Sequence, residues 1–200
     1  MQANELHGEA RGLTRRRLLR AGAVAAAGTL AEASTPEGAI LTGSSLKQRR
    51  LAVVRRHMNT ENQDAFGQTL ATFGTPRYEF MATGQVDNHR QAVRGYYDTI
   101  ESAFPDQHTS DWRMRYAPGE EADRDAVVVE FLFTGTQKGA FVGIPATGKK
   151  VSCRMAAFFF FARGSDRLDD ERVYFDAGTL LIQLGVIPKF YPGWLGPLPH

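Results

Sequence analysis

An arginine, a tyrosine and an aspartate in the C-terminal third of the chain have the residue types and spacing for acid–base chemistry. Strand alternation places Arg154 on one face of a predicted strand, and Tyr174 and Asp176 on one face of the next. A buried ionisable group is costly unless it is paired or used. Around an apolar cavity, Asp176 would remove a proton beside a carbonyl while Arg154 or Tyr174 stabilises the enolate oxygen.

The same residues also fit a purely structural arrangement. Arg154 and Asp176 would then form an ion pair, or Asp176 would cap the helix that it precedes. Spacing alone leaves the catalytic and the structural interpretation open.

Four further residues are candidates for contact with a substrate. Trp112 and Met114 lie on the predicted inner face of one strand, and Phe158 lies on that of another. His108 is the histidine on a predicted core-facing strand, where it is either a structural residue or, given its near-neutral pKa, a functional one. The five histidines form no pair at metal-ligand spacing on one helix, so we expect no metal site.

One segment resembles a phosphate-binding loop without matching it. Gly143–Lys149 has the glycine and lysine spacing, but Lys150 stands where serine or threonine should hold magnesium. The β-patterned run after it is also the wrong context, because such a loop must open a helix. The segment is predicted to connect two antiparallel strands.

Composition limits the classes of function. The 200 residues and 22.1 kDa fit one domain of ordinary size, and 42% hydrophobic with 23% charged residues is typical of a folded globular protein. Residues 1–33 hold five arginines against three glutamates, and the other 19 basic and 19 acidic residues balance. A neutral domain does not support nucleic-acid binding. Cys153 is the single cysteine, which excludes an intrachain disulfide.

The first half of the folded part is predicted to be helical. Ser44 or Ser45 caps a helix, a second helical stretch spans 66–73, and Tyr78–Met81 is a short strand. The clearest helix starts at Asn88 and stops before Pro105.

Period-2 patterns then indicate strands, which are the runs His108–Tyr116, Ala126–Thr134, Lys150–Ala162 and Glu171–Phe175. A short helix covers Asp176–Leu184. The four phenylalanines at 158–161 are apolar on both faces, which predicts a central strand with helices on one side and a partner subunit as a possible cover on the other. This order predicts an α+β fold with helices on one face of a curved, mostly antiparallel sheet.

The N-terminus has the three parts of an export signal. Arg15–Arg16 precede the apolar stretch Ala21–Leu30 and a small-x-small site that ends at Ala33, which resembles a twin-arginine leader. We therefore expect export by the twin-arginine machinery to the periplasm or the outside of the cell, with no stable membrane span after leader removal. The predicted organisation is a leader at 1–33, a linker at 34–45, a domain at 46–187 and a Pro/aromatic tail at 188–200.

Five segments, taken together and in order, resemble one family over roughly residues 51–188. They are Ala103–Asp106, Gly135–Thr136, Gly139–Lys149, Glu171–Asp176 and Gln183–Gly185. The set is similar to the SnoaL-like polyketide cyclase and ester cyclase family, whose members have the cone-shaped α+β barrel of nuclear transport factor 2 relatives.

The resemblance implies a cofactor-independent enzyme of cyclase or lyase type. In the best-known members an aspartate shortly before the final helix is the acid/base, and Asp176 is the matching position. The implied ligand is a small, apolar carbonyl or ester compound, and the implied assembly is a homodimer formed through the sheet. Gln137 departs from the histidine that the family often has after the Gly-Thr pair. A dehydratase or isomerase, or a binding or interaction module without catalysis, stays an alternative on the same fold.

Overall fold

The computed structural model describes residues 45–121 and 124–189. The predicted leader, the linker apart from Ser45, and the tail from residue 190 onward lie outside these ranges and stay predictions. Within the described ranges no helix has the length and apolar character needed to cross a membrane.

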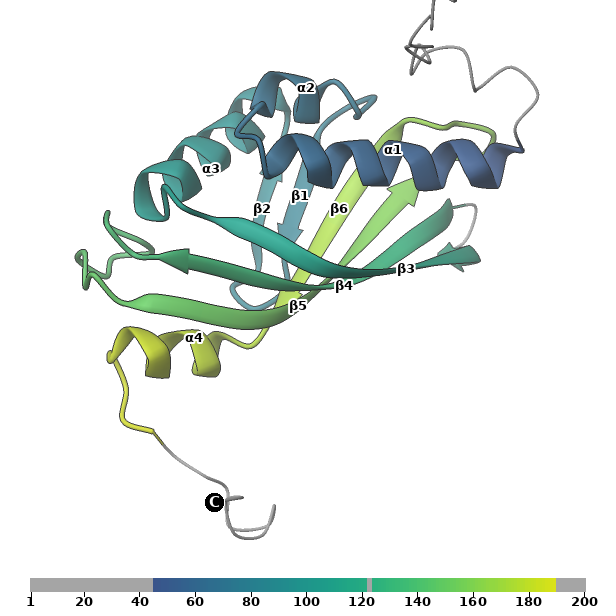
Figure 1. The fold of residues 1–200 in the computed structure, drawn as a ribbon. Helices are drawn as coiled ribbons and strands as arrows, with labels where there is room; N and C mark the ends of the chain where they lie inside the picture. The colour runs from purple at the N-terminus through teal and green to yellow at the C-terminus, as the bar shows by residue number, and fades with distance from the viewer. Residues whose placement is uncertain (1–44, 122–123, 190–200) are drawn as a thin grey trace, which may run out of the picture. The chain divides into compact units, whose positions relative to one another are not determined.

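A curved sheet of six strands forms the centre of the domain (Figure 1). Its strands are β1 (Arg77–Phe80), β2 (Gln85–Asn88), β3 (His108–Glu121), β4 (Arg124–Thr136), β5 (Lys150–Phe161) and β6 (Leu168–Phe175). In the order β2-β1-β6-β5-β4-β3, every neighbouring pair is antiparallel except β1 and β6. The sheet is not closed, since β2 and β3 are its edges. This arrangement confirms the predicted fold class.

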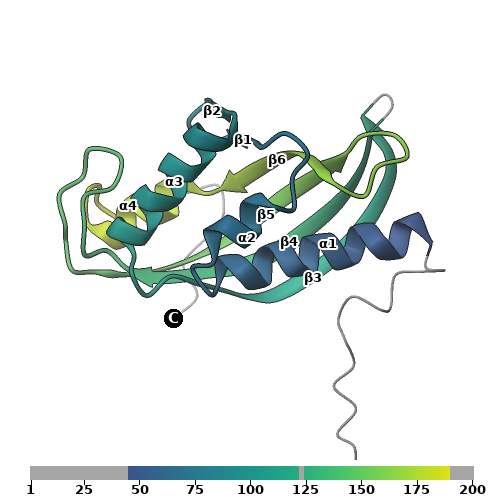
Figure 2. The ribbon, with the colours of Figure 1, turned by 90° about the horizontal axis from the view of Figure 1, so that it is seen from above.

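Four helices accompany the sheet, namely α1 (Leu46–Glu61), α2 (Phe66–Leu70), α3 (Arg90–Ala103) and α4 (Ala177–Leu184). The first three cover one face of the sheet, and the apolar core lies between them and that inner face (Figures 1 and 2). Helix α4 follows β6 and lies against β5. Ser45 caps α1 together with Gln48 in a capping box, as predicted for one of the two serines.

The start of α3 corrects one prediction. Its N-cap is His89, whose side chain accepts a hydrogen bond from the backbone of Ala92. Asn88 instead ends β2, where it pairs with Arg77. Strand β2 escapes detection from the sequence because three of its four residues are polar and the strand is largely exposed, so it shows no apolar alternation.

The sequence correctly predicted which residues of β5 and β6 share a face of the sheet, but it assigned the wrong face to the interior. Arg154 and Phe158 do share a face, and Tyr174 lies beside Ala156 on the neighbouring strand. That face, however, points away from α1–α3, and Cys153 and its alternate neighbours point toward them. Because both faces of β5 carry apolar residues, the pattern says which residues lie together but not which face the helices cover.

A bulge in β3 changes which residues face inward. Asp111 has a φ of 54°, and the register with β4 shifts at this point. Before the bulge Thr109 is buried and His108 is exposed; after it Trp112 and Met114 pack against the core. The expectation that His108 shares the inner face of these two residues is therefore wrong.

The phenylalanine run forms part of a central strand, as predicted, because β5 lies between β4 and β6. On the outer face the guanidinium groups of Arg124 and Arg172 lie 4.4 Å and 4.5 Å from the ring centre of Phe160. Cation–π contacts within the chain thus cover this ring.

Candidate functional site

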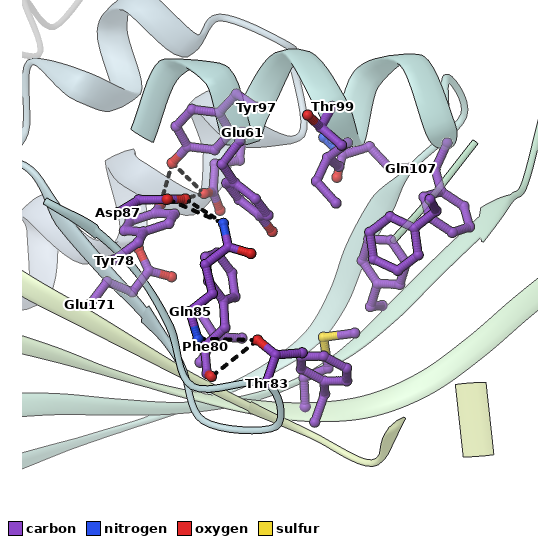
Figure 3. A pocket seen from close by; sticks show the side chains of 18 of the residues that line it. Glu61, Tyr78, Phe80, Thr83, Gln85, Asp87, Tyr97, Thr99, Gln107 and Glu171 are labelled. Carbon is purple, nitrogen blue, oxygen red and sulfur yellow. Dashed lines mark hydrogen bonds between the residues drawn. The ribbon is translucent and has the colours of Figure 1, made fainter. Parts of the chain in front are cut away.

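An apolar cavity of about 400 Å³ lies between the helices and the inner face of the sheet. Its walls are mainly aromatic and aliphatic and include Phe80, Phe104, Phe131, Phe133, Met155 and Phe175. Four polar side chains meet at one side of it: Glu61, Tyr78, Tyr97 and Glu171 (Figure 3). An apolar cavity with a few convergent polar groups is the usual form of a small-molecule site.

These four side chains come from four different elements. Glu61 is the last residue of α1, Tyr97 lies in α3, and Tyr78 and Glu171 are paired residues on the parallel strands β1 and β6. The two tyrosines are fully buried, and the Glu171 side chain is 6% exposed. Residues distant in sequence therefore form one polar cluster. We call these four residues and the neighbouring His57 the inner cluster.

The carboxylate of Glu61 is the acceptor at the centre of the inner cluster. Its Oε1 atom accepts hydrogen bonds from the hydroxyls of Tyr97 at 2.8 Å and Tyr78 at 3.0 Å. It also lies 3.2 Å from Nε2 of His57. Three donors on one oxygen favour the ionised form of Glu61.

His57 lies behind the cavity wall, and its hydrogen bonds define its charge. Thr72 donates its hydroxyl proton to the carbonyl of Thr69, so the same hydroxyl must accept the bond from His57 Nδ1 at 2.8 Å. On the other side, Nε2 lies 2.9 Å from the hydroxyl of Tyr78, 3.2 Å from Oε1 of Glu61 and 3.1 Å from Oε2 of Glu171. With Nδ1 fixed as a donor and carboxylates at Nε2, the ring is an imidazolium.

The pKa values in the inner cluster follow from this arrangement. Burial alone lowers the pKa of His57, but Glu61 and Glu171 outweigh it and raise the value to about 9. Burial raises the pKa of Glu61, yet the charge of His57 and the three hydrogen bonds lower it overall. Glu171 keeps a raised pKa, because burial and the nearby charge of Glu61 outweigh the attraction of His57. One positive charge between two carboxylates therefore holds one of them ionised and leaves the other easier to protonate.

Glu171 has the free lone pair that a base needs. Its Oε2 atom is buried and within ion-pair distance of His57, but no hydrogen-bond donor among the described residues is aligned with it. Burial, which is the main cause, and the nearby carboxylates raise the pKa values of Tyr78 and Tyr97 well above the usual range. The two phenols therefore stay protonated and serve as donors at neutral pH.

His57, Glu61 and Glu171 are also the one group in the described part of the chain that offers three metal-ligating atoms, all within 4.8 Å of one another. Those atoms already contact each other, and the proton on Nε2 supplies the positive charge between the carboxylates. The proton on Nε2 of His57, which lies between the two carboxylates, thus accounts for the close approach of these three side chains.

The structure places Asp176 outside the cavity. It is exposed, and it caps α4 by accepting hydrogen bonds from the hydroxyl and backbone of Thr179, which lower its pKa. These are the contacts expected if Asp176 serves to cap the helix that it precedes. No observation tests the catalytic role of Asp176, which stays a prediction.

Arg154, Tyr174 and Asp176 do lie together, around an open depression on the outer face. Arg154 pairs with Asp111 at 3.1 Å rather than with Asp176, and both partners are more than half exposed. Phe158 contacts Tyr174, with ring centres 5.3 Å apart. The sequence predicted the grouping but placed it on the wrong side of the sheet.

None of the seven predicted site residues lines the cavity described above. Trp112 and Met114 pack against the core instead, and His108 is exposed at the start of β3. The cavity walls come from the residues that alternate with the predicted ones, such as Met155 and Phe175.

Sequence reasoning missed the inner cluster, although two signals were present. Glu61 continues the buried stripe of Val54 and Met58 along α1, so an acid stands at a core-facing helical position. Glu171 alternates with Val173 and Phe175 on an otherwise apolar strand face. An acid inside an apolar stripe is the pattern that points to this site.

The comparisons with known proteins agree with this fold. The model of a family described as SnoaL-like polyketide cyclase matches residues 49–184. Among curated proteins, none matches the chain.

Similar solved structures have low identity. A putative SnoaL-like polyketide cyclase from Jannaschia sp. CCS1 is 21% identical, with a TM-score of 0.60 over 72% of this chain and 97% of that one. AclR, a putative hydroxylase from Streptomyces galilaeus, is 18% identical, with a TM-score of 0.59 over 76% and 89%. A protein with the ketosteroid isomerase-like fold from Catenulispora acidiphila DSM 44928 is 16% identical, with a TM-score of 0.51 over 70% and 97%. At such identities the likeness shows the fold.

Proposed function

Because the chain belongs to the SnoaL-like polyketide cyclase family, whose fold supports a cyclase- or isomerase-type role, we propose that the inner cluster is an acid–base site. Its substrate is a small, largely apolar carbonyl or ester compound, and Glu171 is the base. The observation that supports this most is the buried Oε2 atom of Glu171, without an aligned donor, at the polar side of an apolar cavity.

The first step is proton abstraction from the carbon beside the carbonyl. Glu171 takes the proton, and the electron pair of the broken C–H bond becomes the enolate double bond. The negative charge moves to the carbonyl oxygen, and a phenol of Tyr78 or Tyr97 that turns its single proton from Glu61 toward this oxygen stabilises the charge. Both phenols line the cavity beside Glu171.

The second step returns the proton or forms a ring. The enolate can take the proton from Glu171 at a different carbon of its conjugated system, which gives isomerisation. Alternatively, the enolate carbon attacks a second carbonyl of the same molecule and the oxygen of that carbonyl takes the proton from Glu171, which gives cyclisation. His57 does not line the cavity, so it acts as a fixed positive charge that keeps Glu61 ionised. A base is most effective when its pKa approaches the working pH, and the raised pKa of Glu171 suits this role.

Exchange of carbon-bound protons for deuterium tests the proposal without knowledge of the natural substrate. The full chain is incubated in D₂O with 2-tetralone, a small apolar ketone, and loss of its α-proton signals is followed by NMR. We expect catalysed exchange, a loss of about 10³-fold in rate for Glu171→Gln, and no effect of a chelator. Binding of the ketone is measured in parallel by ligand-observed NMR.

Asp176→Asn is the matched control, because it also replaces one carboxylate by an amide, at the position that directly follows β6. Exchange by this variant should stay within twofold of the wild type. If instead Asp176→Asn loses the activity and Glu171→Gln keeps it, the acid/base is Asp176. Binding of the ketone without any exchange would favour a ligand-binding module.

A further inference from the structure

A tight turn at the edge of the cavity holds an unusual residue. Phe141 and Ile144 exchange backbone hydrogen bonds of 3.0 Å and 2.8 Å, which leaves Val142 and Gly143 as the two turn residues. Their φ angles are 44° and 80°. Turns with positive φ at both central residues favour asparagine, aspartate and glycine.

Val142 is therefore in a strained conformation. The other non-glycine residues with positive φ in the described ranges are Asp64 between α1 and α2, His89 before α3 and Asp111 in β3, and these residue types tolerate positive φ better. A β-branched residue there is an outlier whose persistence needs a reason. Val142 is also the most exposed of the large hydrophobic residues described, at 64%, and it nevertheless lines the cavity.

The surrounding loop fixes the position of this turn. Gln137 is fully buried, and its side chain donates to the carbonyls of Ile144 and Pro145 while it accepts from the backbone and hydroxyl of Thr147. This network explains the glutamine that departs from the family pattern, because the amide both donates and accepts.

Two contacts hold the other arm of the loop against α3. Gly139 lies so close to Ser102 that a Cβ atom would be 2.3 Å from its carbonyl oxygen. The ring of Phe141 packs edge-on against Phe104, with centres 5.2 Å apart. The turn is thus anchored on both sides, and its anchors hold Val142 at the cavity edge despite the strain.

We propose that Val142 is a ligand-contacting residue, whose isopropyl group covers the exposed end of an apolar compound bound in the cavity. The ligand in turn removes an exposed hydrophobic side chain from water. This inference relies on the proposed function only in that the cavity takes an apolar ligand; it does not depend on proton transfer.

Replacement of Val142 separates strain from ligand contact. In Val142→Asn the turn receives a residue that accepts positive φ, so we expect the thermal midpoint to rise by about 3 °C. The same change removes the apolar contact, so the Kd for 2-tetralone in ligand-observed NMR should rise about tenfold. Val142→Ile keeps the contact and should keep the wild-type Kd.

Val86→Asn is the matched control. Val86 is also exposed, and it lies on β2 between two residues that line the cavity without lining it itself. This variant should raise neither the thermal midpoint nor the Kd. A stabilised Val142→Asn that binds 2-tetralone as tightly as the wild type would overturn the proposal, as would a wild-type protein that does not bind the ketone. Binding without proton exchange would contradict the proposed function and leave this inference intact.

Discussion

Asp170 and Glu171 are consecutive buried acids on β6, yet they serve different purposes. Asp170 points to the outer face, where Arg77, Arg124 and Arg172 lie 2.7 Å, 3.1 Å and 3.2 Å from its carboxylate oxygens. Glu171 points to the inner face, and within residues 45–121 and 124–189 its one cationic partner is His57.

The difference shows what makes a buried acid available for chemistry. Three arginines satisfy Asp170 and hold the strands together, and the carboxylate has no access to the cavity. Glu171 shares one cation with Glu61 and lines the cavity, and its pKa is raised. A buried carboxylate with several cationic partners is thus a structural acid. A buried carboxylate that shares one cation and lies beside an apolar cavity can exchange a proton.

The strongest test of this contrast compares substitution at the two neighbouring positions. Glu171→Gln should lower the rate of α-proton exchange about 10³-fold in a folded protein. Asp170→Asn should leave exchange within twofold but lower the free energy of unfolding by about 3 kcal/mol, because it removes the charge of a buried carboxylate on which three arginines converge. Exchange rates and denaturant unfolding measure the two effects, and equal activity losses would contradict the division of roles.

The inner cluster should also make stability depend on pH. The pKa of His57 is raised from 6.5 to about 9, so the folded state binds this proton more tightly than the unfolded state. Its contribution, about 3 kcal/mol, is complete below pH 6.5 and is lost as pH rises through 9. Denaturant unfolding from pH 6 to 10 measures this loss.

His57→Gln is the control for the pH effect, since it removes the titrating ring and keeps hydrogen-bonding capacity. The decline in stability between pH 6.5 and 9 should be absent in this variant. A decline of the same size would assign the effect to another group.

The cap of α4 should contribute a smaller amount. Asp176→Ala removes the acceptor for Thr179 and should lower the free energy of unfolding by about 1 kcal/mol. Asp176→Asn keeps a good capping residue and should change the free energy of unfolding by only a few tenths of the effect of Asp176→Ala. Thermal or denaturant unfolding of both variants distinguishes them, and a larger effect of Asn than of Ala would rule out a capping role.

The smallest effect is expected on the outer face at Arg154. Its ion pair with Asp111 is more than half exposed on both sides, so solvent screens it. Arg154→Ala should change stability by less than about 0.5 kcal/mol and leave exchange of 2-tetralone unaltered. A loss of exchange would show that the outer depression takes part in the reaction.

Much of the fold could be predicted from the sequence, because its signals are local. The cap at Ser45, the helical stripe that ends before Pro105 and the long period-2 runs each depend on neighbours in the chain. The polar strand β2 and the bulge at Asp111 lack such a signal, since pairing with distant residues defines them.

The candidate site required tertiary structure for a different reason. Alternation along β5 and β6 establishes which side chains share a face, but it is symmetric between the two faces when both carry apolar residues. The packing of α1–α3 on one side makes Glu171 an inner residue and Tyr174 an outer one. Likewise, the sequence contains an acid within the buried stripe of α1, but only the packing of α1 and α3 on the sheet brings Glu61, Tyr97 and Glu171 to one cavity.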